Sequence, residues 1–312
     1  DWSSDVCSSD LLKARPEEQA ALDECHIYLI CRRPVASFDP ATFKFDPQGS
    51  TGHLVYRVGG EERRHAFRAM ILPPPEHTIV VGPYPHRMLM AADGAEPTDI
   101  HWPAWFIAIG SEQEDDILRD LEVLYVGQAF GDGSRTAIDR LRSHATLQKI
   151  LAENAANRPD DEIILLLFKY EGPSLFTSMD GINKDGIRGE EDHEHFMSLI
   201  DKPLSEKQVV SLAEAGLIRY FAPEYNEIYK SSFPAEDQKV LNDCYRLDFA
   251  GLIVEIDTED VHLRLGSPAT PGKGVHHIAK FDLHDPELRR SFFSMVDEKG
   301  RYALMNQSGP TY

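Results

Sequence analysis

The stretch that most constrains the fold is one helix, residues 205–222, whose start, end and rotation can be read from the sequence. Ser205 and Gln208 have the spacing of a capping box, which fixes the first turn. Pro223 disfavours a helical conformation in the residue before it, so the helix ends near Phe221. Because both ends are fixed, the direction of each side chain on the helix is fixed as well.

Glu214 lies in the middle of the apolar face of this helix. At about 100° per residue, four apolar side chains fall within about 60° of Glu214 on the helical wheel. These four are Val210, Leu217, Ile218 and Phe221. A carboxylate that faces the interior is strongly unfavourable unless it meets a cation or takes up a proton. We therefore expect an arginine, a metal ion or a proton at Glu214, and a purely structural Glu–Arg pair is the simplest alternative.

The composition limits the classes of protein to which the chain can belong. The 312 residues carry a formal net charge of −20, which argues against unspecific binding to bulk DNA. No apolar run reaches the length of a membrane helix, so we expect no membrane partner. The cysteines at positions 7, 25, 31 and 244 form neither a zinc pattern nor a disulfide framework, which favours a cytoplasmic protein.

The sequence divides into four regions. Residues 1–11 resemble a translated sequencing-adapter tail, so we expect them to be non-native and the true N-terminus to be missing. Residues 12–100 read as a β-rich region with a hairpin at Gly59-Gly60. Residues 101–230 form a mixed domain, and residues 231–312 an α+β region that we expect to pack with the N-terminal one. The predicted fold class is α+β.

Within the middle domain the predicted elements alternate between strands and helices. WFIAIG (105–110) and VLYVGQ (123–128) are predicted strands, a helix is predicted over 135–153, and EIILLLFKY (162–170) is a predicted central strand. Near the C-terminus, we expect a hairpin across DTED (257–260), a strand at HIAKFDL (277–283) and a helix over 286–297. The helix over 135–153 is locally basic, with Arg140 and His144 one turn apart.

The order of these elements is similar to that of the GIY-YIG nuclease superfamily, over residues 101–230. LYVGQ resembles the second signature strand, and E-x2-LI-x2-F-x-P-x-YN follows in the final helix. The residues at the motif positions are Tyr125, Gly127, Arg140, His144, Glu214 and Asn226. In the first signature strand, Trp105, Phe106 and Ile107 stand where the family has Gly-Ile-Tyr, so the first tyrosine is absent. Tyr28 is the alternative first tyrosine, but about 100 residues separate it from LYVGQ, so we give it less weight.

The resemblance implies Mg²⁺-dependent cleavage of phosphodiester bonds in DNA or RNA. Glu214 would hold the Mg²⁺, because this ion prefers hard oxygen ligands. Arg140 would stabilise the transition-state charge, Tyr125 or His144 would orient or deprotonate water, and Asn226 would fix the geometry. Substrate contacts are expected from Gln128, Arg135 and Arg142. The missing first tyrosine and the charge of −20 leave a second function open, a catalytically degenerate domain that binds nucleic acid or a protein partner.

Two further signals point more weakly to metal binding, and a third feature, a pair of histidines, is expected to be a core or surface pair. Asn183, Asp185 and Gly186 match part of a calcium-loop pattern, but a glycine occupies the first ligand position. A second group, Asp192, His193, Glu194 and His195, has metal-ligand chemistry in what reads as an exposed polar loop. His276 and His277 lie in a predicted strand, whose alternation turns one of the two inward. A chance match to the motif within an unrelated soluble protein is the remaining alternative.

Overall fold

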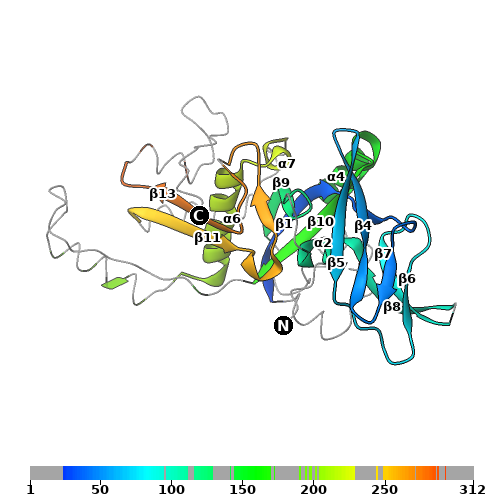
Figure 1. The fold of residues 1–312 in the computed structure, drawn as a ribbon. Coiled ribbons are helices and arrows are strands. Elements are labelled where there is room, and N and C mark those ends of the chain that lie inside the picture. Colours follow the sequence, from blue (N-terminus) through cyan, green and yellow to red (C-terminus); the bar gives the residue numbers. More distant parts are fainter. Residues whose placement is uncertain are drawn as a thin grey trace.

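The computed structural model describes residues 24–94, 96–111, 116–128, 141, 144–169, 172, 190, 194, 197–198, 201, 204–228, 244, 249–270, 272–285, 287 and 292. The described chain mixes helices with several small sheets, so the predicted α+β class is confirmed. Figure 1 shows α6, β11 and β13 at one end, the central strands in the middle and strands β4–β8 at the other end. Among the described residues, no helix is long and apolar enough to cross a membrane.

The central sheet draws its strands from distant parts of the sequence. Its order is β10 (Asp161–Lys169), β1 (Cys25–Pro34), β9 (Asp120–Gln128) and β12 (Arg264–Gly266). β1 lies antiparallel to both β10 and β9, while the short β12 runs parallel to the start of β9. The strand beside β9 is therefore β1 from the N-terminal region.

Opposite faces of the central sheet are covered by different helices. Along β1, side chains alternate between the two faces. Leu29 packs in one apolar cluster with α6 (Glu206–Phe221), and Ile30 packs in another with α4 (Ala145–Asn157). Both side chains are fully buried, so β1 is the central strand of the core.

Helix α6 is buried on nearly every side. One side faces the central sheet, and the other packs against the two-stranded sheet of β11 (Gly251–Asp257) and β13 (His276–Asp282). Gly216 permits this second contact, because a Cβ there would lie 2.6 Å from Val254 Cγ2. The capping box of Ser205 is present and the helix ends at Phe221, as predicted, but the amphipathic reading is too simple because polar positions are buried as well.

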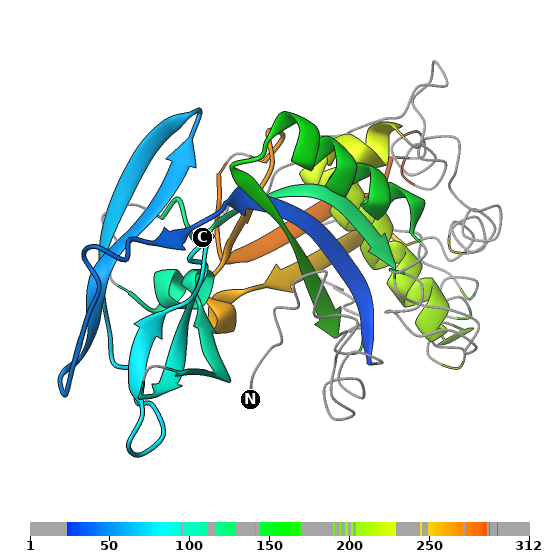
Figure 2. The ribbon, with the colours of Figure 1, turned by 90° about the vertical axis from the view of Figure 1, so that its right-hand side faces the viewer.

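A second β-rich unit is inserted between β1 and β9. It contains β2 (Ser37–Phe38), β3 (Lys44–Asp46), β4 (Gly49–Val58), β5 (Glu61–Ala69), β6 (Thr78–Val81), β7 (Met88–Asp93), β8 (Glu96–Pro103) and α2 (Ala104–Gly110). Its strands form two sheets, with β4 and β5 joined at Gly59-Gly60 as predicted. Figure 2 shows this unit set apart from the central strands and α4.

Two of the predicted elements are replaced by other elements in the structure. Residues 105–110 are not a strand but belong to α2, because Ile107, Ala108 and Ile109 lie one after another on buried positions that a helix can pack. DTED does not close a hairpin: a short 3-10 helix, Glu259–Val261, redirects the chain, so that β11 pairs with β13 and β12 pairs with β9. Residues of β11 and β13 share an apolar cluster with Leu29 of β1, and in the described residues neither strand pairs with β2–β8.

The predicted helix over 135–153 is interrupted at His144. Leu141 is helical, but His144 has an extended backbone (φ −79°, ψ 107°) and forms the N-cap of α4. The predicted strands at 123–128, 162–170 and 277–283 are confirmed as β9, β10 and β13. Most of the predicted helix over 286–297 lies outside the described residues, as do residues 1–11.

Candidate functional site

Tyr28 on β1 and Gly127 on β9 face each other directly in the sheet. The phenol of Tyr28 lies over Gly127 so closely that a Cβ at residue 127 would be 2.5 Å from both Cζ and Oη of Tyr28. The same Cβ would be 2.8 Å from the Tyr125 ring. Residue 127 therefore has to be glycine for the two tyrosines to adopt this arrangement.

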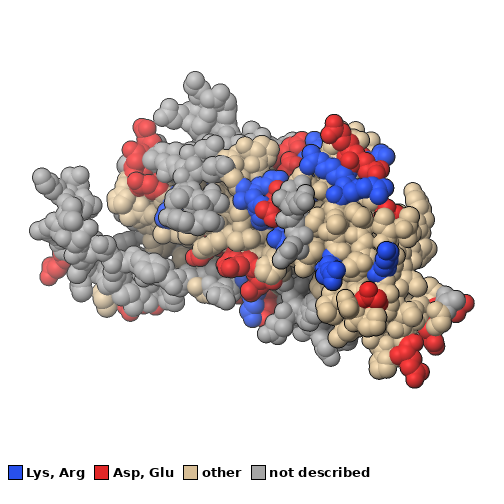
Figure 3. Space-filling view, viewed as in Figure 1, with Lys and Arg blue, Asp and Glu red and all other residues tan. Residues whose placement is uncertain are grey.

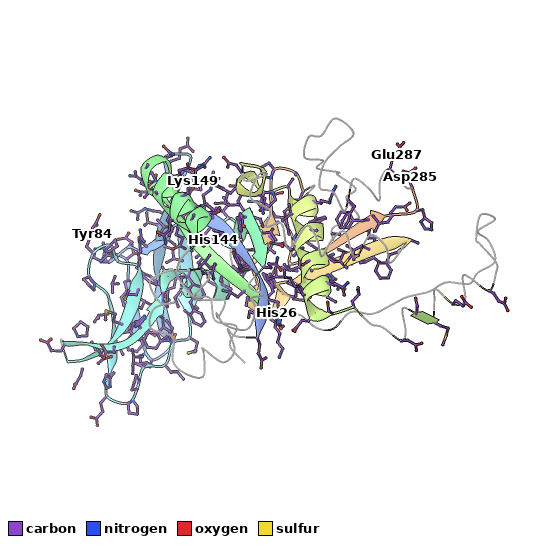
Figure 4. All side chains as sticks on the ribbon, turned by 180° about the vertical axis from the view of Figure 1, so that it is seen from behind. His26, Tyr84, His144, Lys149, Asp285 and Glu287 are labelled. Atoms are coloured by element: carbon purple, nitrogen blue, oxygen red, sulfur yellow. The ribbon has the colours of Figure 1, made fainter. Side chains whose placement is uncertain are left out.

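Two tyrosines and a histidine form a contiguous aromatic group. The rings of Tyr28 and Tyr125 stack with centroids 6.1 Å apart, and the His144 ring lies edge-on to both, at 5.8 Å and 5.2 Å. His144 reaches them because α4 starts beside the ends of β1 and β9. Figure 4 shows His144 at that end of α4, with Lys149 farther along the same helix.

The tautomer of His144 follows from its two hydrogen bonds. Its Nδ1 accepts the backbone N–H of Leu147 at 3.2 Å, so Nδ1 carries no proton. The ring proton of the neutral imidazole is then on Nε2, which lies 3.1 Å from the Tyr28 hydroxyl oxygen. His144 consequently donates to Tyr28, and it could accept a further proton only by giving up its role as helix cap.

Glu214 projects from α6 to the end of β9. Its Oε1 accepts the backbone N–H of Gln128 at 3.0 Å. Only 7% of Glu214 is exposed, which confirms the predicted inward direction of this carboxylate. A backbone donor thus meets one oxygen of Glu214, next to the Gly127 position that carries the aromatic group.

Asn226 completes the outer edge of β9. Its side-chain oxygen accepts the N–H of Val126 at 2.7 Å, and its amide donates to the Val126 carbonyl at 2.9 Å. β12 pairs with β9 only as far as Glu122, so the amide of Asn226 takes the place of a neighbouring strand. Glu214 does the same for Gln128, and the two side chains together fix the end of β9.

The predicted site residues fall into two groups. Five of them, Tyr125, Gln128, His144, Glu214 and Asn226, come together around the last three residues of β9. Arg135, Arg140 and Arg142 lie outside the described residues. Exposure varies within the first group: Gln128 is buried at 4%, while Tyr125, His144 and Asn226 are half-buried.

The strand that lies beside β9 is β1 and not the segment 105–110. Trp105, Phe106 and Ile107 lie in α2, and the tyrosine beside β9 is Tyr28. The run HIYLI carried the signal, since it has a tyrosine within an apolar strand. The separation of about 100 residues between Tyr28 and LYVGQ argues against Tyr28 in the sequence, and the inserted β-rich unit accounts for that separation. Tyr28 is itself 1% exposed.

Among the described residues of the candidate site, Glu214 is the one that supplies a carboxylate. Glu214 offers a hard oxygen donor, and Mg²⁺ usually keeps several waters and takes few protein ligands. The described residues contain no group of three or more His, Cys, Asp or Glu placed to hold a metal. The calcium-like residues 183–186 lie outside the described residues, as do Asp192, His193 and His195.

His277 is a buried core histidine, and His276 is partly exposed, as the alternation predicted. His277 Nε2 lies 2.9 Å from the Gly274 carbonyl, and its Nδ1 lies 3.0 Å from the Tyr220 hydroxyl. Burial lowers the pKa of His277 below its ordinary value. This histidine belongs to the packing of β13 against α6.

No protein-family model, curated protein or solved structure matches this chain. Its function is therefore inferred from the residues and their geometry alone.

Proposed function

We propose that this protein is a GIY-YIG-like nuclease that cleaves phosphodiester bonds in DNA or RNA with the help of Mg²⁺. The observation that carries the proposal is the convergence of Tyr28, Tyr125, His144, Glu214 and Asn226 on the end of β9. With β1 beside β9, HIY (26–28) takes the part of the first signature strand and LYVGQ that of the second. The absence of a first tyrosine is then no longer an objection.

The three residues of the aromatic group have different roles in the proposed activation of water. Tyr125 is half-buried, which supports the assignment of its hydroxyl as the group that would meet a nucleophilic water. His144 acts as a hydrogen-bond donor to Tyr28, because its Nδ1 is used to cap α4. Tyr28 is buried and supports the orientation of the His144 and Tyr125 rings.

Glu214 is the residue that would hold Mg²⁺, with Asn226 and the Gln128 N–H fixing its surroundings. The bound ion would supply positive charge to the phosphate and to the leaving oxygen. Gln128 contributes its backbone rather than an exposed side chain, which changes its expected role from substrate contact to support of Glu214. Arg135, Arg140 and Arg142 remain the proposed phosphate contacts.

The test is cleavage of supercoiled plasmid and of single-stranded RNA with Mg²⁺, compared with EDTA. Glu214→Gln is the informative variant, because its amide oxygen can still accept from Gln128 N–H while the charge is lost. We expect wild type to cleave, Glu214→Gln and Tyr125→Phe to lose activity, and Tyr84→Phe to keep it. Tyr84 is a matched control because it is 87% exposed on the inserted unit. Full activity in a folded Glu214→Gln variant would refute the assignment.

A second candidate function, a non-catalytic binding module on the same fold, is favoured by burial and charge. Tyr28 and Glu214 are both buried, and the net charge is −20. On the face in Figure 3, basic side chains gather over the β4–β5 hairpin with acidic ones beside them. Arg64 of that hairpin is already paired with Asp39 at 2.8 Å and Glu62 at 3.3 Å. This candidate predicts binding without cleavage, unaffected by EDTA or by Glu214→Gln.

A further inference from the structure

The short helix α7 (Glu224–Ile228) connects the two elements that carry the candidate site. Asn226 is bound to Val126 of β9 through both of its amide atoms. The preceding residue, Tyr225, donates its hydroxyl to Glu153 Oε2 of α4 at 2.6 Å. Two consecutive side chains therefore tie α4 and β9 to the same turn of chain.

Tyr225 is built to remain a hydrogen-bond donor. It is 6% exposed and packs in the same apolar cluster as Tyr28 and Leu147. Burial and the neighbouring Glu153 raise the pKa of Tyr225 to about 12, so the hydroxyl keeps its proton across the physiological range. Glu153 is held from its other side by Lys149, whose Nζ lies 3.6 Å from Oε1.

The bond at Glu153 lies near the opposite end of α4 from His144. His144 caps the start of this helix, roughly 13 Å along the axis from Glu153 at about 1.5 Å per residue. The other tie near Glu153 is Asn154 Nδ2 to the Asp161 carbonyl, 2.9 Å, which leads to β10. The Tyr225–Glu153 bond thus adds a link from α4 through α7 to β9, beside the apolar packing of Leu147 and Ile150 and the direct ring contact of His144 with Tyr125.

We propose that Tyr225 is a positioning residue that sets the place of the His144 ring against Tyr28 and Tyr125. The consequence for catalysis rests on the proposed function, whereas the consequence for the ring does not. Removing the hydroxyl releases one end of α4, and a small rotation there displaces the ring at the other end. Misplacement of a reacting group by about 1 Å costs up to roughly a hundredfold in rate.

The experiment uses the full chain and three variants. Tyr225→Phe removes the donor and keeps the ring packing. Glu153→Leu removes the acceptor at a side chain that is 42% exposed, and it serves if Tyr225→Phe does not fold. Lys149→Gln is the control, because it removes the other partner of Glu153 and leaves Tyr225 untouched. The readouts are the nitrogen NMR signals of the His144 ring, assigned with His144→Asn, and kcat and KM for plasmid cleavage.

We expect Tyr225→Phe and Glu153→Leu to shift the His144 ring signals and to lower kcat by roughly tenfold to a hundredfold with KM little changed. Lys149→Gln should leave both readouts at wild type. Unmoved His144 signals in Tyr225→Phe, or an equal shift in Lys149→Gln, would overturn the assignment of Tyr225. If the wild-type chain cleaves nothing, the proposed nuclease function fails, and the ring signals still decide the role of Tyr225.

Discussion

His144 makes two separate hydrogen bonds, and the choice of substitution decides whether one or both are lost. Its Nδ1 caps α4 through the Leu147 N–H, and its Nε2 donates to Tyr28. His144→Ala removes both bonds and the ring contacts. The lost cap costs about 1 kcal/mol, and the lost contacts with the rings of Tyr28, which is buried, and Tyr125, which is half-buried, cost about 1 kcal/mol more. His144→Asn replaces the cap with a residue that is strongly preferred there and leaves Tyr28 without its donor.

Urea denaturation followed by circular dichroism measures the first effect, and Mg²⁺-dependent cleavage measures the second. We expect His144→Ala to lose about 2 kcal/mol of unfolding free energy and His144→Asn to lose about half of that. Both variants should lose cleavage to a similar extent, since neither can donate to Tyr28. Equal destabilisation in the two variants would show that capping is not what His144 contributes. Cleavage by His144→Asn at the wild-type rate would contradict the proposed role of His144 as a donor to Tyr28.

Three other outcomes follow from the packing. Asn226→Ala should lower the free energy of unfolding by about 2–3 kcal/mol, because the backbone of Val126 loses a donor and an acceptor at once. Asn226→Asp should be no more stable, since a second acceptor would face the Val126 carbonyl. Urea denaturation measures both variants. Gly216→Ala should destabilise the folded chain despite a helix-propensity gain of about 1 kcal/mol, because the new Cβ collides with Val254. Adding Val254→Ala to the same chain should recover part of the lost stability. Because the pKa of His277 is lowered in the folded chain, the unfolded chain binds a proton at this histidine more readily. Stability should therefore fall as the pH drops below about 6.5. Thermal melts at several pH values measure this fall, which should be less steep in His277→Gln.

Each of these three expectations has a contradicting result. An Asn226→Asp variant as stable as wild type would mean that the Val126 carbonyl does not need a donor. A stabilised Gly216→Ala would mean that β11 and β13 can move away from α6. An unchanged acid slope in His277→Gln would assign the low-pH loss of stability to other groups.

The sequence predicted local features well and long-range pairing poorly. The capping box of Ser205, the inward Glu214 and the strand at 162–170 depend on neighbours within a few residues, so their patterns were sufficient. The pairing of Tyr28 with Gly127 depends on contacts across almost 100 residues, which no periodicity encodes. The prediction of a strand over residues 105–110 was wrong because a short apolar run fits a buried strand and a buried helix equally well. The cap at His144 was missed because histidine is not among the residues preferred at helix starts.

The insertion between β1 and β9 has a consequence for the order of folding. Arg32 pairs with Glu122 in the central sheet, so the inserted unit begins and ends at adjacent positions of that sheet. Loop closure becomes only slowly more costly with length, yet pairings of large sequence separation form slowly. A unit with its own apolar core, as β2–β8 has, can collapse first and hold the two ends of the excursion together. The central strands would then zip from Arg32 towards Tyr28, and the aromatic group at the end of β9 would be among the last parts to assemble.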